Sequence, residues 1–247
     1  MKITLIGAGN LGNQFYASLS KQKQFDLVQW VDRSAHNSKT AAGVSVINTL
    51  DNLQKTDLYL LAISDESIAM VSQMLPDNAL VVHTAGGVSL EAINQKRAGV
   101  FYPVQSFSQN RTIDFSSVPL GIETKNTSDY TLLDQLAKSL GAQAFALNTK
   151  QREQLHLAAV LANNFSNHLF AEAAAICEDN NLPFKLLKPL IRETVDKLET
   201  LDPKEAQTGP AIRNDQKTLD KHLELIKKPQ LKEIYNILTS AIQKNNE

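Results

Sequence analysis

The first twelve residues constrain the fold of this 247-residue chain more than any other stretch. Residues 2–6 are mostly apolar and β-branched, as in a buried strand, and lead directly into Gly7-Ala8-Gly9-Asn10-Leu11-Gly12. Residues 14–21 then mix polar and apolar side chains in the manner of a helix. A G-x-G-x-x-G turn between a strand and a helix is the context in which this pattern binds a dinucleotide.

Each glycine of the turn has its own physical reason. Gly7 permits the tight turn, Gly9 lets the backbone approach a pyrophosphate, and Gly12 lets the helix pack closely on the strand. The free N–H groups and the positive dipole end of the helix favour phosphate. The alternative is a structural turn that holds no ligand. We expect a cofactor to be bound by Gly7, Ala8, Gly9, Asn10, Leu11 and Gly12.

The end of the second expected strand, residues 25–31, carries conflicting signals about the cofactor. Asp32 lies twenty residues after Gly12, where an acidic side chain hydrogen-bonds the ribose hydroxyls of NAD. Arg33 and Ser34 follow, and a guanidinium with a hydroxyl suits the 2′-phosphate of NADP. Arg33 could equally be a solvated surface charge. We expect all three residues to bind the cofactor, and they leave NADP and NAD both open.

Strands and helices alternate through the first 147 residues. This alternation predicts an α/β fold with a Rossmann-type, doubly wound parallel sheet. Further strands are expected at 57–64, 79–83, 100–104, 118–123 and 142–147, with a helix at 130–140. Ligands bind at the carboxyl ends of such strands. We therefore expect cofactor contacts from Ile63, Ser64, Asp65, His83 and Thr84, although Asp65 could instead cap a helix and His83 could satisfy loop carbonyls.

The pattern changes at Asn148, which can cap a helix together with Gln151. Residues 151–179 contain no glycine or proline and are rich in alanine and leucine. Helices are also expected at 184–201, 215–227 and 230–244, separated by prolines and a glycine. We therefore predict a Rossmann dinucleotide-binding domain at 1–149 and a smaller, all-helical domain at 150–247.

A polar stripe lies on the long expected helix. At about 100° per residue, His156, Asn163 and Asn167 project from nearly the same face, with Asn164 to one side, among apolar neighbours. Histidine can donate a proton near neutral pH, and asparagine can orient a carbonyl group. The same stripe could form a buried hydrogen-bond network between helices or subunits. Both interpretations stay open.

Charge and cysteine content exclude several classes of function. The net charge is −1, from 25 basic and 26 acidic residues without a basic tract, so no nucleic-acid partner is expected. The single cysteine, Cys177, excludes an internal disulfide framework and a cysteine-rich metal site. The N-terminus does not resemble a signal peptide, and no apolar run is long enough to span a bilayer. We expect a cytoplasmic protein with no membrane partner.

The whole chain resembles the family described as a Rossmann-like domain followed by a DUF2520 domain, and more distantly resembles pyrroline-5-carboxylate reductases and F420-dependent NADP oxidoreductases. Six stretches carry the resemblance: Gly7-x-Gly9-x-x-Gly12, Leu61-Ala-Ile-Ser-Asp65, His83-Thr84-x-Gly86, Pro103-x-Gln105-x-Phe107, His156-x-Ala158-Ala159-x-Leu161-Ala162 and Thr208-Gly209-Pro210-x-x-Arg213-x-Asp215. Two positions depart from the family pattern, since Tyr102 replaces a histidine and Ala85 a serine. The resemblance implies an NADP-dependent oxidoreductase whose helical domain closes a cleft over the nicotinamide and forms a homodimer.

These features together suggest hydride transfer between a nicotinamide and a small carbonyl or imine substrate. His156 is the candidate acid, Asn163 or Asn164 would orient the substrate, and Arg213 could hold a substrate carboxylate. Arg213 could instead pair with Asp215 or Glu153 and fix the turn before it. The alternative function is a non-catalytic NAD(P)-binding redox sensor or regulatory protein.

Overall fold

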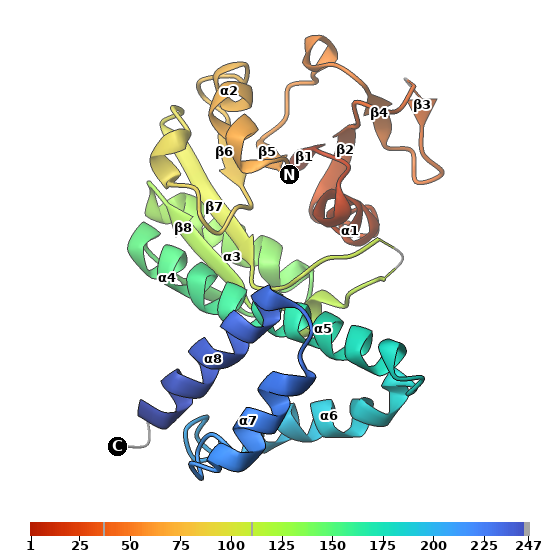
Figure 1. Cartoon of the computed structure of the whole chain (residues 1–247). Coiled ribbons are helices and arrows are strands. Elements are labelled where there is room, and N and C mark those ends of the chain that lie inside the picture. The colour runs from red at the N-terminus through yellow and green to blue at the C-terminus, as the bar shows by residue number, and fades with distance from the viewer. Residues whose placement is uncertain (37, 110, 245–247) are drawn as a thin grey trace. The chain divides into compact units, whose positions relative to one another are not determined.

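The computed structural model describes residues 1–36, 38–109 and 111–244, and divides into two compact units, Met1–Asn164 and Phe165–Glu247 (Figure 1). The first unit contains an α/β sheet and the second is helical. The division into domains after residue 149 stays a prediction. It falls earlier than the boundary between the compact units, which lies inside the long helical segment.

One sheet organises the first unit, with strand order β3-β4-β2-β1-β5-β6-β7-β8-β9 among the described residues. The inner order β4-β2-β1-β5-β6-β7 is all parallel and is that of a Rossmann fold, which confirms the predicted class. Two pairs, β3 with β4 and β7 with β8, are antiparallel. The strands are β1 (Lys2–Ile6), β2 (Asp26–Val31), β3 (Ser38–Lys39), β4 (Ser45–Ile47), β5 (Leu58–Leu61), β6 (Leu80–His83), β7 (Arg97–Pro103), β8 (Leu120–Thr124) and β9 (Ala144–Ala146).

Alternating side chains of the sheet form two separate apolar cores. On β5, Leu58 and Leu60 enter one core, whereas Tyr59 and Leu61 enter the other, as the pleat of a strand requires. The first core is covered by α1 (Asn10–Leu19) and α3 (Thr127–Ser139), and the second by α2 (Ile68–Gln73) (Figure 1). Because both faces are covered, the parallel strands are almost continuously apolar.

The long helical segment begins with the predicted capping box. The Asn148 side chain accepts a hydrogen bond from the Gln151 N–H at 2.9 Å, and the Gln151 side chain accepts one from the Asn148 N–H at 3.0 Å. Helix α4 (Thr149–Ala159) then continues through a π-helical stretch, Val160–Phe165, into α5 (Ser166–Asp179). The sequence pattern predicted this segment but not the π-helical turn within it.

The second unit contains, besides α5, the helices α6 (Lys188–Asp196), α7 (Gln216–Leu225) and α8 (Pro229–Lys244). Within this unit, His222 of α7 and Tyr235 of α8 share a hydrogen bond of 2.8 Å. Lys228 and Glu172 form an ion pair of 2.8 Å. Across the described ranges, no helix combines the length and apolar character needed to cross a membrane.

Candidate functional site

A cavity of about 710 Å³ opens at the carboxyl ends of β1, β2, β4 and β5. It lies where the order of the sheet reverses on either side of β1, which is where open α/β sheets bind ligands. The residues that line it are Ile6, Gly7, Ala8, Gly9, Asn10, Leu11, Val31, Asp32, Arg33, Ser34, Asn48, Thr49, Leu50, Ala62, Ile63, Ser64, Ser67, Met70, Val71, Met74 and Thr84.

The three glycines of the turn differ in the space around them. Gly7 has φ +117°, and a Cβ built on it would lie 2.1 Å from the Ala62 carbonyl oxygen. A Cβ on Gly12 would lie 2.2 Å from the Gly7 carbonyl oxygen. A Cβ on Gly9, however, would meet nothing within 4 Å. The fold therefore requires glycine at the first and third positions, while the open side of Gly9 faces space that a ligand can use.

The N-terminus of α1 is prepared for an anion. Gly9 is its N-cap and has no side chain to accept from the first N–H groups, and the first turn carries no acidic residue. Asn10 donates to the Phe107 carbonyl at 2.9 Å, which ties the segment after β7 to the start of this helix. The backbone N–H groups thus remain available for a phosphate, so this cradle fits the pyrophosphate of a dinucleotide.

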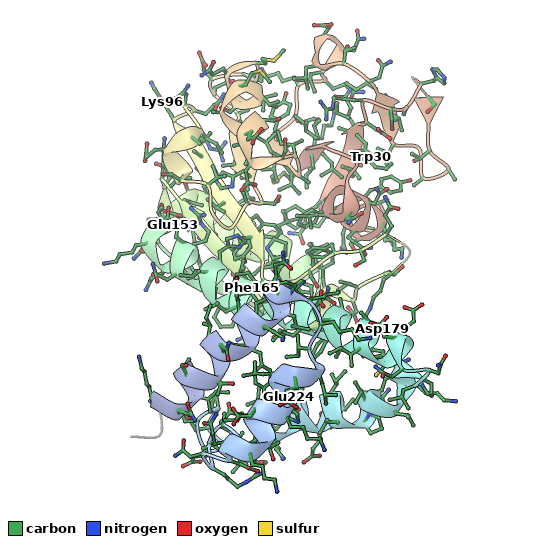
Figure 2. The ribbon with its side chains drawn as sticks, in the orientation of Figure 1. Trp30, Lys96, Glu153, Phe165, Asp179 and Glu224 are labelled. Atoms are coloured by element: carbon green, nitrogen blue, oxygen red, sulfur yellow. The ribbon has the colours of Figure 1, made fainter. Side chains whose placement is uncertain are left out.

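An aromatic pair supports the turn from behind. Trp30 of β2 (Figure 2) donates from its indole N–H to the Gly7 carbonyl oxygen at 2.9 Å. Its ring stacks on Tyr16 of α1 with centroids 4.4 Å apart. These contacts fix the peptide unit that follows β1, and so hold the glycine turn in one conformation.

At the end of β2, the Asp32 carboxylate accepts hydrogen bonds within its own loop. Its Oδ1 accepts hydrogen bonds from the Ser34 N–H at 2.9 Å and from the Ser34 hydroxyl at 2.7 Å. Arg33, which lies between these two residues in the sequence, is exposed and lines the cavity. One carboxylate oxygen is therefore occupied within the loop, while the guanidinium projects from it. This arrangement eases the conflict between the aspartate and a 2′-phosphate.

The structure brings most of the predicted cofactor residues to the cavity. Besides the turn residues and the end of β2, Ile63, Ser64 and Thr84 line it. Gly12, Asp65 and His83 do not. Gly12 lies beneath the turn, Asp65 is exposed, and His83 is fully buried. Whether these residues contact a cofactor stays a prediction.

The lining residues that were not predicted include single neighbours of the predicted ones (Ile6, Val31, Ala62 and Ser67) and two larger groups. Asn48, Thr49 and Leu50 follow β4, a strand of three residues that is too short to show a pattern in the sequence. Met70, Val71 and Met74 come from α2 and the residue after it, and the two methionines are largely exposed. The sequence holds no signal for them, because the exposure of the methionines is visible only in the fold.

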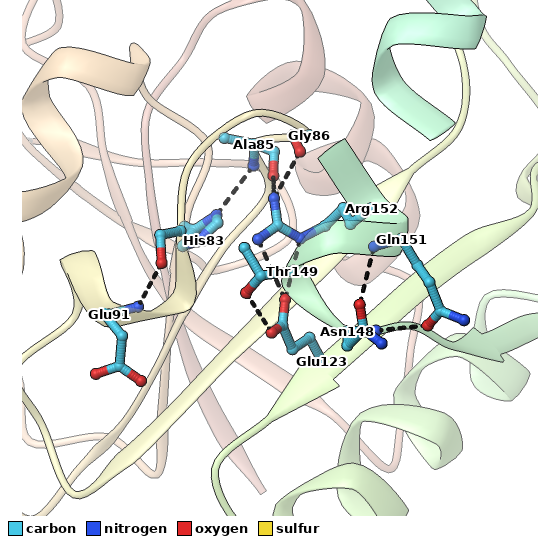
Figure 3. Close-up of polar contacts among 10 residues, drawn as sticks. His83, Ala85, Gly86, Glu91, Glu123, Asn148, Thr149, Gln151 and Arg152 are labelled. Atoms are coloured by element: carbon cyan, nitrogen blue, oxygen red, sulfur yellow. Dashed lines mark hydrogen bonds and ion pairs between the residues drawn. The ribbon is translucent and has the colours of Figure 1, made fainter. Parts of the chain in front are cut away.

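A second polar cluster lies at the ends of β6 and β8. Arg152 of α4 is completely buried and donates to Glu123 Oε2 from Nε at 3.2 Å and from Nη2 at 3.1 Å (Figure 3). Its Nη1 donates to the carbonyls of Ala85 at 3.3 Å and Gly86 at 2.6 Å. Thr149 also donates its hydroxyl to Glu123. Arg152 thus attaches the loop after β6 to α4 and β8, a role that the sequence did not reveal.

His83, at the end of β6, is neutral at physiological pH. Burial, with the nearby charge of Arg152 as a second cause, lowers its pKa from 6.5 to about 4, and the Ser89 backbone partly opposes the shift. Its Nδ1 accepts from the Ala85 N–H at 3.2 Å. Its buried Nε2 has no hydrogen-bond partner among the residues that the structure describes. His83 therefore does not act as an acid near neutral pH, and its Nδ1 holds the Ala85 N–H at the start of the loop.

His156 lies against the same loop. Its Nδ1 is 3.2 Å from the Tyr102 hydroxyl, and the two rings meet edge to face, with centroids 5.9 Å apart. A Cβ on Gly86 would lie 2.5 Å from that Nδ1, so the imidazole rests directly on the loop backbone. His156 is half-buried. The structure thus joins His156 to Tyr102 and Gly86, which the sequence had placed far apart.

The other candidate catalytic residues are not brought to His156 by any described contact. Asn163 and Asn164 lie in the π-helical stretch and are exposed. A π-turn takes more residues than an α-turn, so the alignment with His156 expected at 100° per residue does not carry through it. Arg213 is exposed in the second unit, where Asp215 instead caps α7 by accepting from the Thr218 N–H and hydroxyl. The catalytic roles of these three residues stay predictions.

The family follows from the sequence of the second half. Residues 118–242, about half of the chain, match the model of the family described as "Domain of unknown function (DUF2520)". The chain belongs to the DUF2520 family. Within the matched residues, Gly209 of the Thr208-Gly209-Pro210 turn has φ +113°, a conformation that favours glycine.

Solved structures place this DUF2520 protein among Rossmann-type folds. A candidate NADP oxidoreductase from Bacteroides fragilis is 35% identical, with a TM-score of 0.87 and coverage of 98% of each chain. A pyrroline carboxylate reductase from Plasmodium falciparum, solved with NADP bound, is 11% identical with a TM-score of 0.63, covering 100% of this chain and 97% of that one. An imine reductase from Myxococcus stipitatus, in complex with NADP+, is 15% identical with a TM-score of 0.63, covering 99% and 92%. No curated protein matches the chain significantly.

Proposed function

We propose that this DUF2520 protein is an NADP-dependent oxidoreductase that transfers a hydride between the nicotinamide and a small carbonyl or imine substrate. The glycine turn carries the proposal. It combines a backbone that requires glycine at Gly7 and Gly12 with open space at Gly9 and an uncapped helix N-terminus. The similarity to the candidate NADP oxidoreductase from Bacteroides fragilis, at 35% identity over nearly the whole chain, supports NADP as the cofactor.

Different residues around the cavity would bind different parts of the dinucleotide. The N–H groups at the start of α1 would bind the pyrophosphate, and the absent side chain of Gly9 would let it approach the backbone. Arg33 would donate to a 2′-phosphate as a charge-assisted hydrogen-bond donor. Ser34 donates two hydrogen bonds to Oδ1 of Asp32, which would reduce the repulsion between this carboxylate and that phosphate. NAD, which lacks the 2′-phosphate, would lose the contact with Arg33.

Proton transfer is assigned to His156. A bound nicotinamide would supply or accept the hydride. His156 would give a proton to the oxygen or nitrogen of the substrate, because an imidazole is suited to proton transfer near neutral pH. Asn163, Asn164 and Arg213 are proposed to orient the substrate, and closure of a cleft by the helical domain, at 150–247, stays a prediction. So does the cytoplasmic location.

We also propose that the protein is a homodimer. The helical unit exposes many large apolar side chains, including Leu186 at 61%, Leu190 at 63% and Val195 at 57%. Exposed large apolar side chains in this number favour a surface that another molecule covers. A second copy of the chain is the partner that the family resemblance suggests.

The first experiment is a titration of the purified protein with NADPH and NADH, followed by nicotinamide fluorescence and thermal stability. Wild-type protein should bind NADPH much more tightly than NADH. Arg33→Ala should weaken NADPH by about tenfold or more, a loss typical of one charge-assisted hydrogen bond, and leave NADH nearly unchanged.

Gly9→Ala is the matched control for the glycine turn. Because a Cβ there meets nothing within 4 Å, this variant should keep its melting temperature without nucleotide and yet lose affinity for both nucleotides. Binding of neither nucleotide by the wild type would overturn the proposal. Tight binding without reduction of any carbonyl or imine in a substrate screen would favour the alternative, a non-catalytic redox sensor.

A further inference from the structure

Tyr102 and His156 form a pair at one edge of the first unit. Tyr102 lies at the end of β7 and is 7% exposed, while His156 projects from α4. Their side chains meet through the phenol oxygen and Nδ1 at 3.2 Å. The interplanar angle of 78° directs the edge of one ring at the other. This geometry leaves the opposite side of the imidazole, with Nε2, pointing away from the hydroxyl.

The chemistry of the two groups decides the direction of the hydrogen bond. Burial raises the pKa of the Tyr102 hydroxyl, with the Arg152 charge opposing, so the phenol keeps its proton at physiological pH. A buried hydroxyl proton needs an acceptor. Within the described part of the chain, His156 Nδ1 is the partner that this hydroxyl has. The hydroxyl therefore donates to Nδ1, and the proton of a neutral His156 lies on Nε2.

The ring is also held from a second direction. Gly86 lies so close to Nδ1 and Cγ of His156 that no side chain could be placed there, and Gly87 approaches Cδ2. The Gly86 carbonyl itself accepts a hydrogen bond of 2.6 Å from Arg152. Arg152 lies one helical turn before His156 on α4. No described residue is hydrogen-bonded to His156 Nε2. The imidazole is thus fixed on its Nδ1 side, and its Nε2 side is left for another molecule.

We propose that Tyr102 is the positioning residue for His156, holding the imidazole so that its protonated Nε2 faces the substrate. This inference rests on the proposed function, in which His156 supplies the proton. In the step itself the Nε2–H bond of the imidazolium breaks and its electron pair stays on the ring. The proton joins the substrate oxygen or nitrogen while hydride arrives at carbon. Before the step the imidazolium donates its Nδ1–H to the Tyr102 hydroxyl oxygen, which can also accept. After the step the ring is neutral, and its remaining proton, on Nδ1, is still donated to that oxygen.

The test uses ¹⁵N NMR of the histidine rings in the full-length protein without nucleotide or substrate. The chain has five histidines, so a His156→Asn variant identifies the His156 signals. Wild-type His156 should show two well-separated nitrogens, with Nε2 protonated and Nδ1 bare and hydrogen-bonded. Tyr102→Phe removes only the hydroxyl, and the two signals should move toward each other as the ring exchanges between tautomers.

The second Tyr–His pair of the chain gives a matched control. His222 and Tyr235 have the same Nδ1-to-hydroxyl contact at 2.8 Å, but lie in the helical unit. Tyr235→Phe should change the His222 signals and leave those of His156 unaltered. A His156 spectrum with Nδ1 protonated, or one that Tyr102→Phe does not change, would overturn the inference.

A kinetic measurement separates positioning from a structural role. With NADPH and a simple cyclic imine (a methylpyrroline), Tyr102→Phe should lower kcat by about 10- to 100-fold, as expected for a misplaced catalytic group, with KM for NADPH unchanged. An equal kcat for the variant and the wild type would refute the positioning role. If the wild type turns over no imine at all, the proposed reaction fails, whereas the NMR result still decides whether Tyr102 fixes the ring.

Discussion

At the scale of single residues, His83 couples the stability of the protein to pH. Its side chain is fully buried, and burial lowers its pKa from 6.5 to about 4. Between these two values the unfolded chain binds a proton at this position that the folded chain does not. The free energy of unfolding therefore increases as pH rises from 4 to 6.5, by up to about 3 kcal/mol. This stabilisation is present above pH 6.5 and is lost on acidification.

Replacing the histidine should remove this dependence. In His83→Asn the amide oxygen can still accept from the Ala85 N–H, and urea unfolding should give a flatter rise in unfolding free energy across this pH range. His168→Asn, at an exposed histidine, should keep the wild-type slope. Equal slopes for His83→Asn and wild type would contradict the assignment of the dependence to His83.

Which residues could be predicted depends on how local their role is. Gly7, Gly9 and Gly12 could be identified because they form one contiguous motif of six residues, although the atom that excludes a side chain at Gly7 is the Ala62 carbonyl oxygen after the neighbouring strand β5. Tyr102 and Arg152 could not, because their roles depend on partners in other strands and loops. A lone arginine in a helical sequence looks like a solvated charge. Only the fold shows that Arg152 is buried against Glu123 and two carbonyls.

At the scale of elements, Arg152 joins α4, β8 and the loop after β6. Arg152→Met should lower the unfolding free energy by roughly 3–5 kcal/mol, because Glu123 would keep a charge at 12% exposure without its partner. Two loop carbonyls would also lose their donor. The unfolding free energy of Arg152→Lys should fall between those of Arg152→Met and the wild type, because one ammonium cannot fully replace the planar guanidinium. Urea unfolding gives the unfolding free energy of the wild type, Arg152→Met and Arg152→Lys.

Two further variants make that prediction specific. The double variant Arg152→Met with Glu123→Gln should recover part of the loss, since it removes the unpaired charge. Lys138→Met breaks an exposed ion pair with Asp134 on α3 and should change stability little. If Arg152→Met were as harmless as Lys138→Met, the cluster would not hold these elements together.

Secondary-structure features could be predicted where the pattern that indicates them lies in contiguous residues. The capping box at Asn148 was predicted and is present, because the four residues involved are contiguous. The π-helical stretch at Val160–Phe165 has no glycine or proline to mark it, and it differs from an α-helix by one step in hydrogen bonding. The antiparallel direction of β8 was likewise not predicted, since an apolar strand has the same pattern in either direction.

At the scale of the whole molecule, the Rossmann-type class of the sheet could be predicted because alternating strands and helices leave few topologies. Strand β3, at one edge of the sheet, and its neighbour β4 were not predicted because they have only two and three residues. Exposure of apolar side chains in the helical half was not evident from the sequence either. Amphipathic spacing marks an apolar face but does not show whether that face packs inside the chain or against another molecule.

The helical unit offers a test of the proposed homodimer. Leu186, Leu190, Leu198 and Leu201 lie on α6 and in the segments next to it, and are each between 41% and 63% exposed. Burying one such side chain in an interface contributes about 1.5–3 kcal/mol, so several together can hold two copies at micromolar concentration. Wild-type protein should therefore have the mass of a dimer in light scattering. Leu190→Asp should be monomeric, because the dimer would have to bury its carboxylate.

A control outside the helical unit separates this effect from general damage. Phe145 on β9 is 44% exposed, and Phe145→Asp introduces the same charge at an apolar position of the first unit. This variant should remain dimeric, and circular dichroism should show that both variants keep their helix content. A monomeric wild type would refute the homodimer. Dissociation by Phe145→Asp but not by Leu190→Asp would instead place the interface on the sheet-containing unit, and the exposed leucines would need another partner.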